Sequence, residues 1–132
     1  MAAAIPAAFH DLLNKRAFAH LATLMPDGRP QVTPVWFDFD GRYIRVNSAK
    51  GRVKDKNMRH DPRVALSIID PDTAYRYLEI RGKVVDISEN GAVAHIDALA
   101  KMYMGLDTYP FHQPGVQRVI YKIEALRCSS MG

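Results

Sequence analysis

The sequence predicts a mainly β protein of the α+β class, in which six antiparallel strands form a closed or nearly closed barrel with flanking helices. Three observations support this fold class. Apolar and polar residues alternate along several short runs, turn residues separate most of these runs by only a few positions, and three other stretches show helical spacing. At 132 residues, 48% of them hydrophobic, the chain is expected to form a single domain, residues 1–132.

The first half of the chain is expected to contain a short helix and three strands. Pro6 suits the first turn of a helix over residues 6–16. One strand contains Pro34, which has no N–H to give to a sheet ladder, so this strand must lie at an edge, form a bulge or face a ligand. The strands are predicted at residues 17–24, 30–39 and 43–46.

The second half is expected to contribute a helix and three further strands, of which residues 75–87 show the clearest alternation. The helix follows Ser88, and Gly105 is predicted to end it because glycine adopts the left-handed conformation common at helix ends. The strands are predicted at residues 63–69, 75–87 and 116–126. Cys128 is expected to lie in a C-terminal tail.

The most informative stretch runs from Val46 to Val64. It is predicted to begin as the end of a strand, to turn at Ser48 and to continue as a basic helix that Pro62 stops. The start of such a helix presents unpaired N–H groups and the positive end of its dipole, which favours an anion and above all a phosphate. A solvated basic helix face is the alternative interpretation. The candidate anion ligands are Ser48, Lys50, Arg52 and Lys54.

Composition restricts the possible partners. The net charge of +4 and a pI near 9.3 favour an anionic partner, which could be nucleic acid, anionic lipid or a phosphorylated small molecule. A single cysteine excludes an intrachain disulfide and a cysteine zinc site, so a cytoplasmic location is expected. We expect no signal peptide, no membrane span and no metal site, since no pair of histidines has ligand spacing with a carboxylate. His20 is interpreted as a structural residue within an apolar strand.

Five segments of the chain resemble one protein superfamily in their order and spacing. They are AHLAT (19–23) with DGRP (27–30), VTPVWF (32–37), residues 48–64, YLEIRGKV (77–84) and KMYMGLDTYP (101–110). Together they resemble the split β-barrel superfamily that includes pyridoxamine-phosphate oxidase. The closer similarity is to its small members that use the deazaflavin coenzyme F420, and segment 101–110 looks typical of that branch.

The resemblance implies a homodimer of split barrels with two coenzyme sites at the subunit interface. It also implies coenzyme F420 as the cofactor, with flavin mononucleotide (FMN) as the alternative. The strand of residues 32–36 would lie along the coenzyme ring, and the start of the basic helix would hold the phosphate. The implied cofactor-binding residues are Val32, Thr33, Pro34, Val35, Trp36, Asn47, Ser48, Lys50, Arg52, Lys54 and Asn57.

The function implied by the resemblance is hydride transfer from the reduced deazaflavin to a conjugated small-molecule acceptor. The cofactor would supply the chemistry, so no catalytic triad is expected. A second proton could come from His112, Tyr109, Tyr77 or water. Pyridoxamine-phosphate oxidase activity is not expected, because the residues after Leu126 do not match the longer C-terminal segment of that enzyme.

Two other classes of function stay open. The first is an FMN oxidoreductase or a flavin-binding protein of the same superfamily. The second is a nucleic-acid-binding module whose basic helix contacts the phosphate backbone. The second class is disfavoured because Asp55 and Asp61 interrupt the basic helix.

Overall fold

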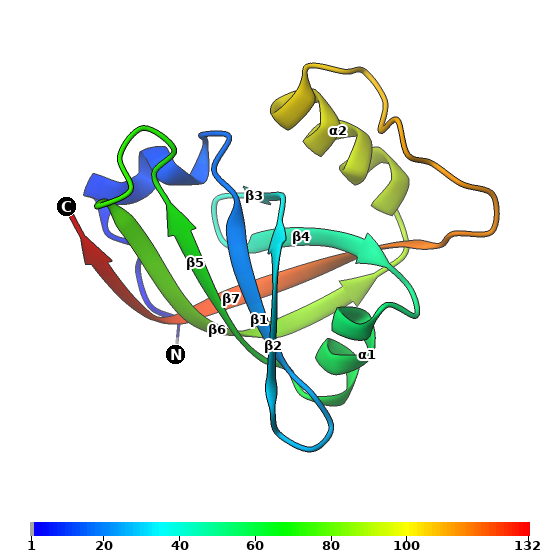
Figure 1. Cartoon of the computed structure of the whole chain (residues 1–132), viewed down its shortest axis with the longest axis horizontal. Helices are drawn as coiled ribbons and strands as arrows, with labels where there is room; N and C mark the ends of the chain where they lie inside the picture. Colours follow the sequence, from blue (N-terminus) through cyan, green and yellow to red (C-terminus); the bar gives the residue numbers. More distant parts are fainter. Residues whose placement is uncertain (1) are drawn as a thin grey trace.

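A computed structural model describes residues 2–132 and confirms a mainly β, antiparallel fold with helices (Figure 1). Within these residues the chain has seven strands rather than the expected six, and the sheet is an open half-barrel. The helices are the 3₁₀-helix η1 (Ala7–Leu13), α1 (Val53–His60) and α2 (Ala92–Met104). The strands are β1 (Ala19–Leu24), β2 (Pro30–Val35), β3 (Phe37–Phe39), β4 (Ile44–Ala49), β5 (Arg63–Ile69), β6 (Tyr77–Ser88) and β7 (Arg118–Met131).

The additional strand arises at Trp36, where the predicted single strand of residues 30–39 divides. On one side of Trp36, β2 pairs with β1, and on the other side β3 pairs with β4. The order in the sheet is β2-β1-β5-β6-β7-β4-β3, so β2 and β3 form its two edges although they are consecutive in the sequence. Pro34 therefore lies on an edge strand, opposite His20, where its missing N–H interrupts no ladder on the open side.

The core fills the concave side of this sheet. Its largest fully buried side chains include Tyr121 of β7 and Phe37 of β3. The alternation of β6 places Leu78 and Ile80 in the core, as the sequence predicted. On the same strand Gly82 lies so close to β7 that a Cβ atom there would be 2.3 Å from the carbonyl oxygen of Glu124. This glycine permits a bulge in the pairing of the two longest strands.

Strand β7 extends further than the predicted boundary of residues 116–126. It continues to Met131 because the long β6 offers it a partner along its whole length, with Tyr77 opposite Met131. Cys128 therefore belongs to a strand, where it is partly buried against the core, and not to a tail. No helix in residues 2–132 combines the length and the apolar character needed to cross a lipid bilayer.

The helices lie at different edges of the half-barrel (Figure 1). Helix α1 packs against β1, and α2 packs against β4 and β7. Gly105, with a φ of +73°, ends α2 as expected. The segment 105–117 then runs from the end of α2 to the start of β7 beyond the sheet (Figure 1).

Candidate functional site

The β4–α1 junction differs from the sequence prediction in where the helix begins. Ser48 is still part of β4, and α1 begins only at Val53, after a turn in which Gly51 has a φ of +94°. The first helical turn holds Asp55, which is 1% exposed and accepts a 2.9 Å hydrogen bond from the backbone N–H of Gly51. Asp55 thus anchors the turn from inside the protein and does not interrupt the basic surface.

Two further donors fix Asp55. The hydroxyl of Tyr121 donates to its carboxylate, and Arg59 pairs with it at 3.0 Å. Burial alone would raise the pKa of Asp55, but the hydrogen bonds from Gly51, Tyr121 and Arg59 outweigh burial and lower it. The carboxylate therefore stays ionised, and the start of α1 is rigidly attached to β7.

A cavity of about 210 Å³, which we call the basic pocket, opens beside this junction. Three cationic side chains line it: Arg52 before α1, Lys54 in its first turn and Arg118 at the start of β7. Among residues 2–132 no carboxylate lies within ion-pair distance of any of the three. Their positive charge is therefore available to an anion.

The charged forms of the cations in the basic pocket are disfavoured by burial and by their mutual repulsion. Burial, with the neighbouring charges of Arg52 and Arg118, lowers the pKa of Lys54. Arg118 is only 6% exposed, and burial lowers its pKa too. Mutual repulsion and desolvation both disfavour this arrangement unless an anion enters, as in a site built for one.

Ser48 provides a second indication that the basic pocket suits an anion. Its residue is 2% exposed, it lines the basic pocket, and its hydroxyl has no hydrogen-bond partner within residues 2–132. A buried polar group without a partner costs about 1–3 kcal/mol. An acceptor such as a phosphate oxygen in the pocket would remove this cost.

An aromatic wall closes another side of the basic pocket. Trp36 stacks on Tyr103 with ring centroids 5.2 Å apart and an angle of 15° between the planes, and Tyr109 meets Trp36 edge-on at 6.1 Å. The hydroxyl of Tyr103 donates to the carbonyl of Ala17 at 2.7 Å, and burial raises the pKa of Tyr103 to about 12. The packing of these rings onto α2 holds Trp36 at the break between β2 and β3.

The structure brings most of the predicted site residues together. The residues of the prediction that line the basic pocket are Pro34, Val35, Trp36, Asn47, Ser48, Arg52 and Lys54. Four others lie outside its lining. Val32 points into solvent, Thr33 has a buried hydroxyl without a partner, Lys50 pairs with Glu89 at 3.2 Å, and Asn57 is buried where its amide donates to the hydroxyl of Thr23.

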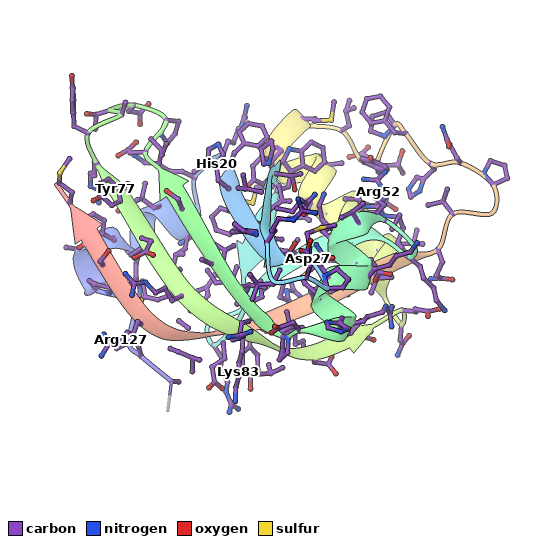
Figure 2. The ribbon with its side chains drawn as sticks, turned by 60° about the horizontal axis from the view of Figure 1, so that its bottom comes forward. His20, Asp27, Arg52, Tyr77, Lys83 and Arg127 are labelled. Carbon is purple, nitrogen blue, oxygen red and sulfur yellow. The ribbon has the colours of Figure 1, made fainter. Side chains whose placement is uncertain are left out.

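The proposed proton donors are also separated. Tyr109 lines the basic pocket, while His112 lies next to Tyr109 and pairs with Asp97 of α2 at 2.8 Å. Figure 2 shows Tyr77 at the opposite end of the sheet from Arg52. His20, expected inside its strand, is exposed, because residues on β1 alternate and Ala19 and Leu21 take the core positions.

Sequence reasoning missed Arg118 altogether. It becomes part of the pocket only because β7 pairs with β4, which places it opposite Ala49. Three aromatic or apolar residues of the lining were missed as well. Phe18 immediately precedes β1, Ile96 lies in α2, and Phe111 lies in the segment after α2. No sequence signal distinguished Arg118, because it shares its face of the predicted strand with Ile120, Lys122 and Glu124.

Comparison with known proteins agrees with this geometry. A family model for pyridoxamine 5'-phosphate oxidase matches residues 5–132. The chain belongs to this family. A solved structure of an F420 reductase is 38% identical over 95% of this chain and 98% of its own, with a TM-score of 0.84. A conserved hypothetical protein of Mycobacterium tuberculosis is 28% identical over 98% of this chain and 86% of its own, with a TM-score of 0.77.

The fold is also similar to that of a more distant solved structure. A provisionally assigned pyridoxamine 5'-phosphate oxidase from Listeria innocua is 21% identical over 93% of this chain and 94% of its own, with a TM-score of 0.71. At this identity the likeness concerns the fold alone. In residues 2–132 no group of three or more His, Cys, Asp or Glu side chains has the arrangement of a metal site.

Proposed function

We propose that this protein is a coenzyme F420-dependent oxidoreductase that reduces a conjugated small molecule. The observation that carries the proposal is the basic pocket, which is lined by three cations without carboxylate partners and by Ser48, whose hydroxyl has no hydrogen-bond partner within residues 2–132. A phosphodiester would satisfy all four groups. The F420 reductase that shares 38% of its residues with this chain supports the choice of coenzyme.

The residues present fit the phosphate of such a coenzyme. Arg52, Lys54 and Arg118 would each donate charge-assisted hydrogen bonds, worth about 1.5–3 kcal/mol apiece when shielded from water. Pro34 and Trp36 lie on the adjoining edge of the sheet, where a planar ring could pack without taking a partner from the ladder.

A bound deazaflavin supplies a hydride. The protein therefore needs to bind and orient the coenzyme and the substrate and to exclude water, and it has no need of a nucleophile. The aromatic wall of Trp36 and Tyr109 would keep water from the ring. Tyr109 is the candidate proton donor that already lines the pocket, and His112 could hold a proton beside it, bridged to Asp97. Solvent water stays the alternative source.

We propose further that the protein works as a homodimer in the cytoplasm. An apolar depression of about 600 Å³ lies over β1, β5, β6 and β7, and a second copy of the chain is the occupant we propose for it. Arg63 and Arg81 line this depression and pair with Asp61 and Glu79 of the same chain, so two copies related by a twofold axis could exchange these ion-pair partners. The substitution Ala65→Glu in the depression should yield monomers in sedimentation experiments.

FMN is the second candidate coenzyme. Its terminal monophosphate would meet the same three cations and Ser48, so the basic pocket by itself favours neither coenzyme. A nucleic-acid module is a weaker candidate, since the unpaired cations line a cavity and not a flat surface.

The experiment that tests the proposal is a parallel titration of the purified protein with coenzyme F420 and with FMN, followed by fluorescence. Tight binding of F420 with weak binding of FMN is the expected result. Preference for FMN would transfer the protein to the flavin-dependent alternative. Binding of neither, with salt-sensitive binding of an oligonucleotide, would overturn the proposal.

A further inference from the structure

A chain of buried hydrogen bonds leads away from the basic pocket into α2. Nε of Arg118 donates to Oδ1 of Asn47 at 2.9 Å, and Nδ2 of Asn47 lies 3.1 Å from Nδ1 of His95. Nε2 of His95 is 3.2 Å from Oδ2 of Asp38. Arg45 donates two hydrogen bonds to the same carboxylate, at 2.8 and 2.7 Å. One end of the chain is thus a pocket cation and the other is a partly exposed ion pair.

The donor and the acceptor of each hydrogen bond in this series follow from the residues at its two ends, Arg118 and Asp38. Arginine can only donate, so the oxygen of the Asn47 amide must face Arg118, and its NH₂ group must face the carbonyl of Ala92, at 2.8 Å, and the ring of His95. Nδ1 of His95 therefore accepts, and Nε2 carries the proton that it donates to Asp38. The neutral Nε2–H tautomer is the form that satisfies all these groups.

The three residues that form these hydrogen bonds are largely buried, although Asn47 and Arg118 line the basic pocket and His95 lines another cavity, of about 440 Å³. Asn47, His95 and Arg118 are 8%, 5% and 6% exposed. If the ring of His95 were removed, the NH₂ group of Asn47 would lose one of its two acceptors, and the amide could rotate away from Arg118.

The group that holds Arg118 is a neutral amide, and this neutrality affects anion binding as much as its position does. A carboxylate at position 47 would hold the guanidinium more tightly but would also neutralise it. The neutral amide orients Arg118 by one N–H and leaves its remaining donors and its full charge to the pocket. A ring that fixes this amide therefore acts on anion binding without touching the anion.

We infer that His95 is a positioning residue for the anion site, which through Asn47 holds the guanidinium of Arg118 in the orientation that binds phosphate. The identity of the anion rests on the proposed function, but the positioning does not, because it concerns contacts within the chain. Asp38 and Arg45 complete the arrangement by fixing the tautomer of His95.

The first test needs no ligand. In ¹⁵N-resolved NMR spectra of the histidine rings, His95 should show the Nε2–H tautomer, and the Nε–H signal of Arg118 should be protected from exchange. In Asn47→Asp, the new carboxylate can only accept, so Nδ1 of His95 loses the donor that faces it and its ¹⁵N signal should shift. An Nδ1–H tautomer in the unmodified protein would overturn the inference, even if every variant failed to fold.

The second test compares two replacements of His95 by titration with coenzyme F420 and FMN. The amide of His95→Gln can accept from Asn47 and donate to Asp38, whereas His95→Leu can do neither. We expect His95→Leu to weaken binding about tenfold, the size expected for a displaced hydrogen bond to a charged group, and His95→Gln to restore affinity to within about threefold.

Equal affinity of a folded His95→Leu variant, with its Arg118 Nε–H still protected, would contradict the inference. If the unmodified protein bound neither coenzyme, the proposed function would fail, and the protection of the Arg118 signal in the two variants would still decide the positioning role.

Discussion

The phenol of Tyr121 and the carboxylate of Asp55 are joined by a hydrogen bond inside the protein, where strand β7 meets the first turn of α1. This contact fixes the helix that carries Lys54 to the strand that begins with Arg118. The basic pocket therefore depends on a buried pair that itself touches no ligand. Its two partners come from positions 66 residues apart in the chain.

Removing the hydroxyl in Tyr121→Phe should destabilise the protein by about 1–3 kcal/mol, because a buried carboxylate then lacks one of its donors. The native pKa of Asp55 is depressed, so its stabilisation is present above the unfolded pKa and is lost as pH falls through the native value. The variant should therefore begin to unfold at a higher pH in acid titrations. Tyr43→Phe is the control, since the Tyr43 hydroxyl makes no hydrogen bond within residues 2–132; an equal loss in both variants would refute this account.

Ser48→Ala should separate stability from binding. The orphaned hydroxyl contributes no hydrogen bond to the fold, so thermal unfolding should be unchanged or shifted upward, by up to about 1 kcal/mol in stability. Affinity for the coenzyme should fall several-fold. Ser67→Ala on β5, outside the pocket, should leave affinity unchanged, and a Ser48→Ala variant that is less stable yet binds normally would show the hydroxyl to be structural.

Coenzyme binding should weaken in alkaline solution. The pKa of Lys54 lies below its usual value of 10.5, because of burial and the charges of Arg52 and Arg118, so this lysine loses its proton earlier than others as pH rises. Above that pKa the anion can bind only with uptake of a proton, and affinity falls. Lys54→Arg stays charged and should lose this pH dependence in titrations from about pH 7 to 10; the same slope in both proteins would assign it to another group.

Gly82→Ala should be strongly destabilising, by about 2–4 kcal/mol, because its Cβ would overlap the backbone of β7 at Glu124. Gly41→Ala is an instructive contrast. Gly41 has open space around it but a φ of +97°, so only the conformational cost of about 1 kcal/mol is expected. Chemical denaturation would measure both, and equal losses would mean that the close approach at the bulge is relaxed easily.

Local patterns were sufficient for much of the fold. Alternation and turn residues located β5 to the residue and β6 to within two, and Gly105 marked the end of α2. The break at Trp36 was not predictable, because it arises from pairing with two strands that are distant in the sheet. The extension of β7 past Leu126 likewise depends on the length of its partner β6.

In the site too, residues that are close in the sequence could be predicted, and residues that only the pairing of distant strands brings there could not. Charge and position along the sequence pointed to Ser48, Lys50, Arg52 and Lys54. All of these except Lys50 line the basic pocket, and their role in binding an anion stays a prediction. Arg118 was missed because only the pairing of β4 with β7 brings it there. Asn57 follows the helical period onto the buried side of α1, so its amide serves the core.

The most direct measurement of the central claim is calorimetric titration of coenzyme F420 into two charge-matched double variants. Arg52→Ala with Lys54→Ala removes two cations from the basic pocket, and Arg42→Ala with Lys83→Ala removes two exposed cations outside it. We predict a loss of affinity of about a hundredfold or more for the first variant and less than about threefold for the second. Equal losses would contradict the phosphate site, because they would mean that the coenzyme responds only to the net charge of the protein.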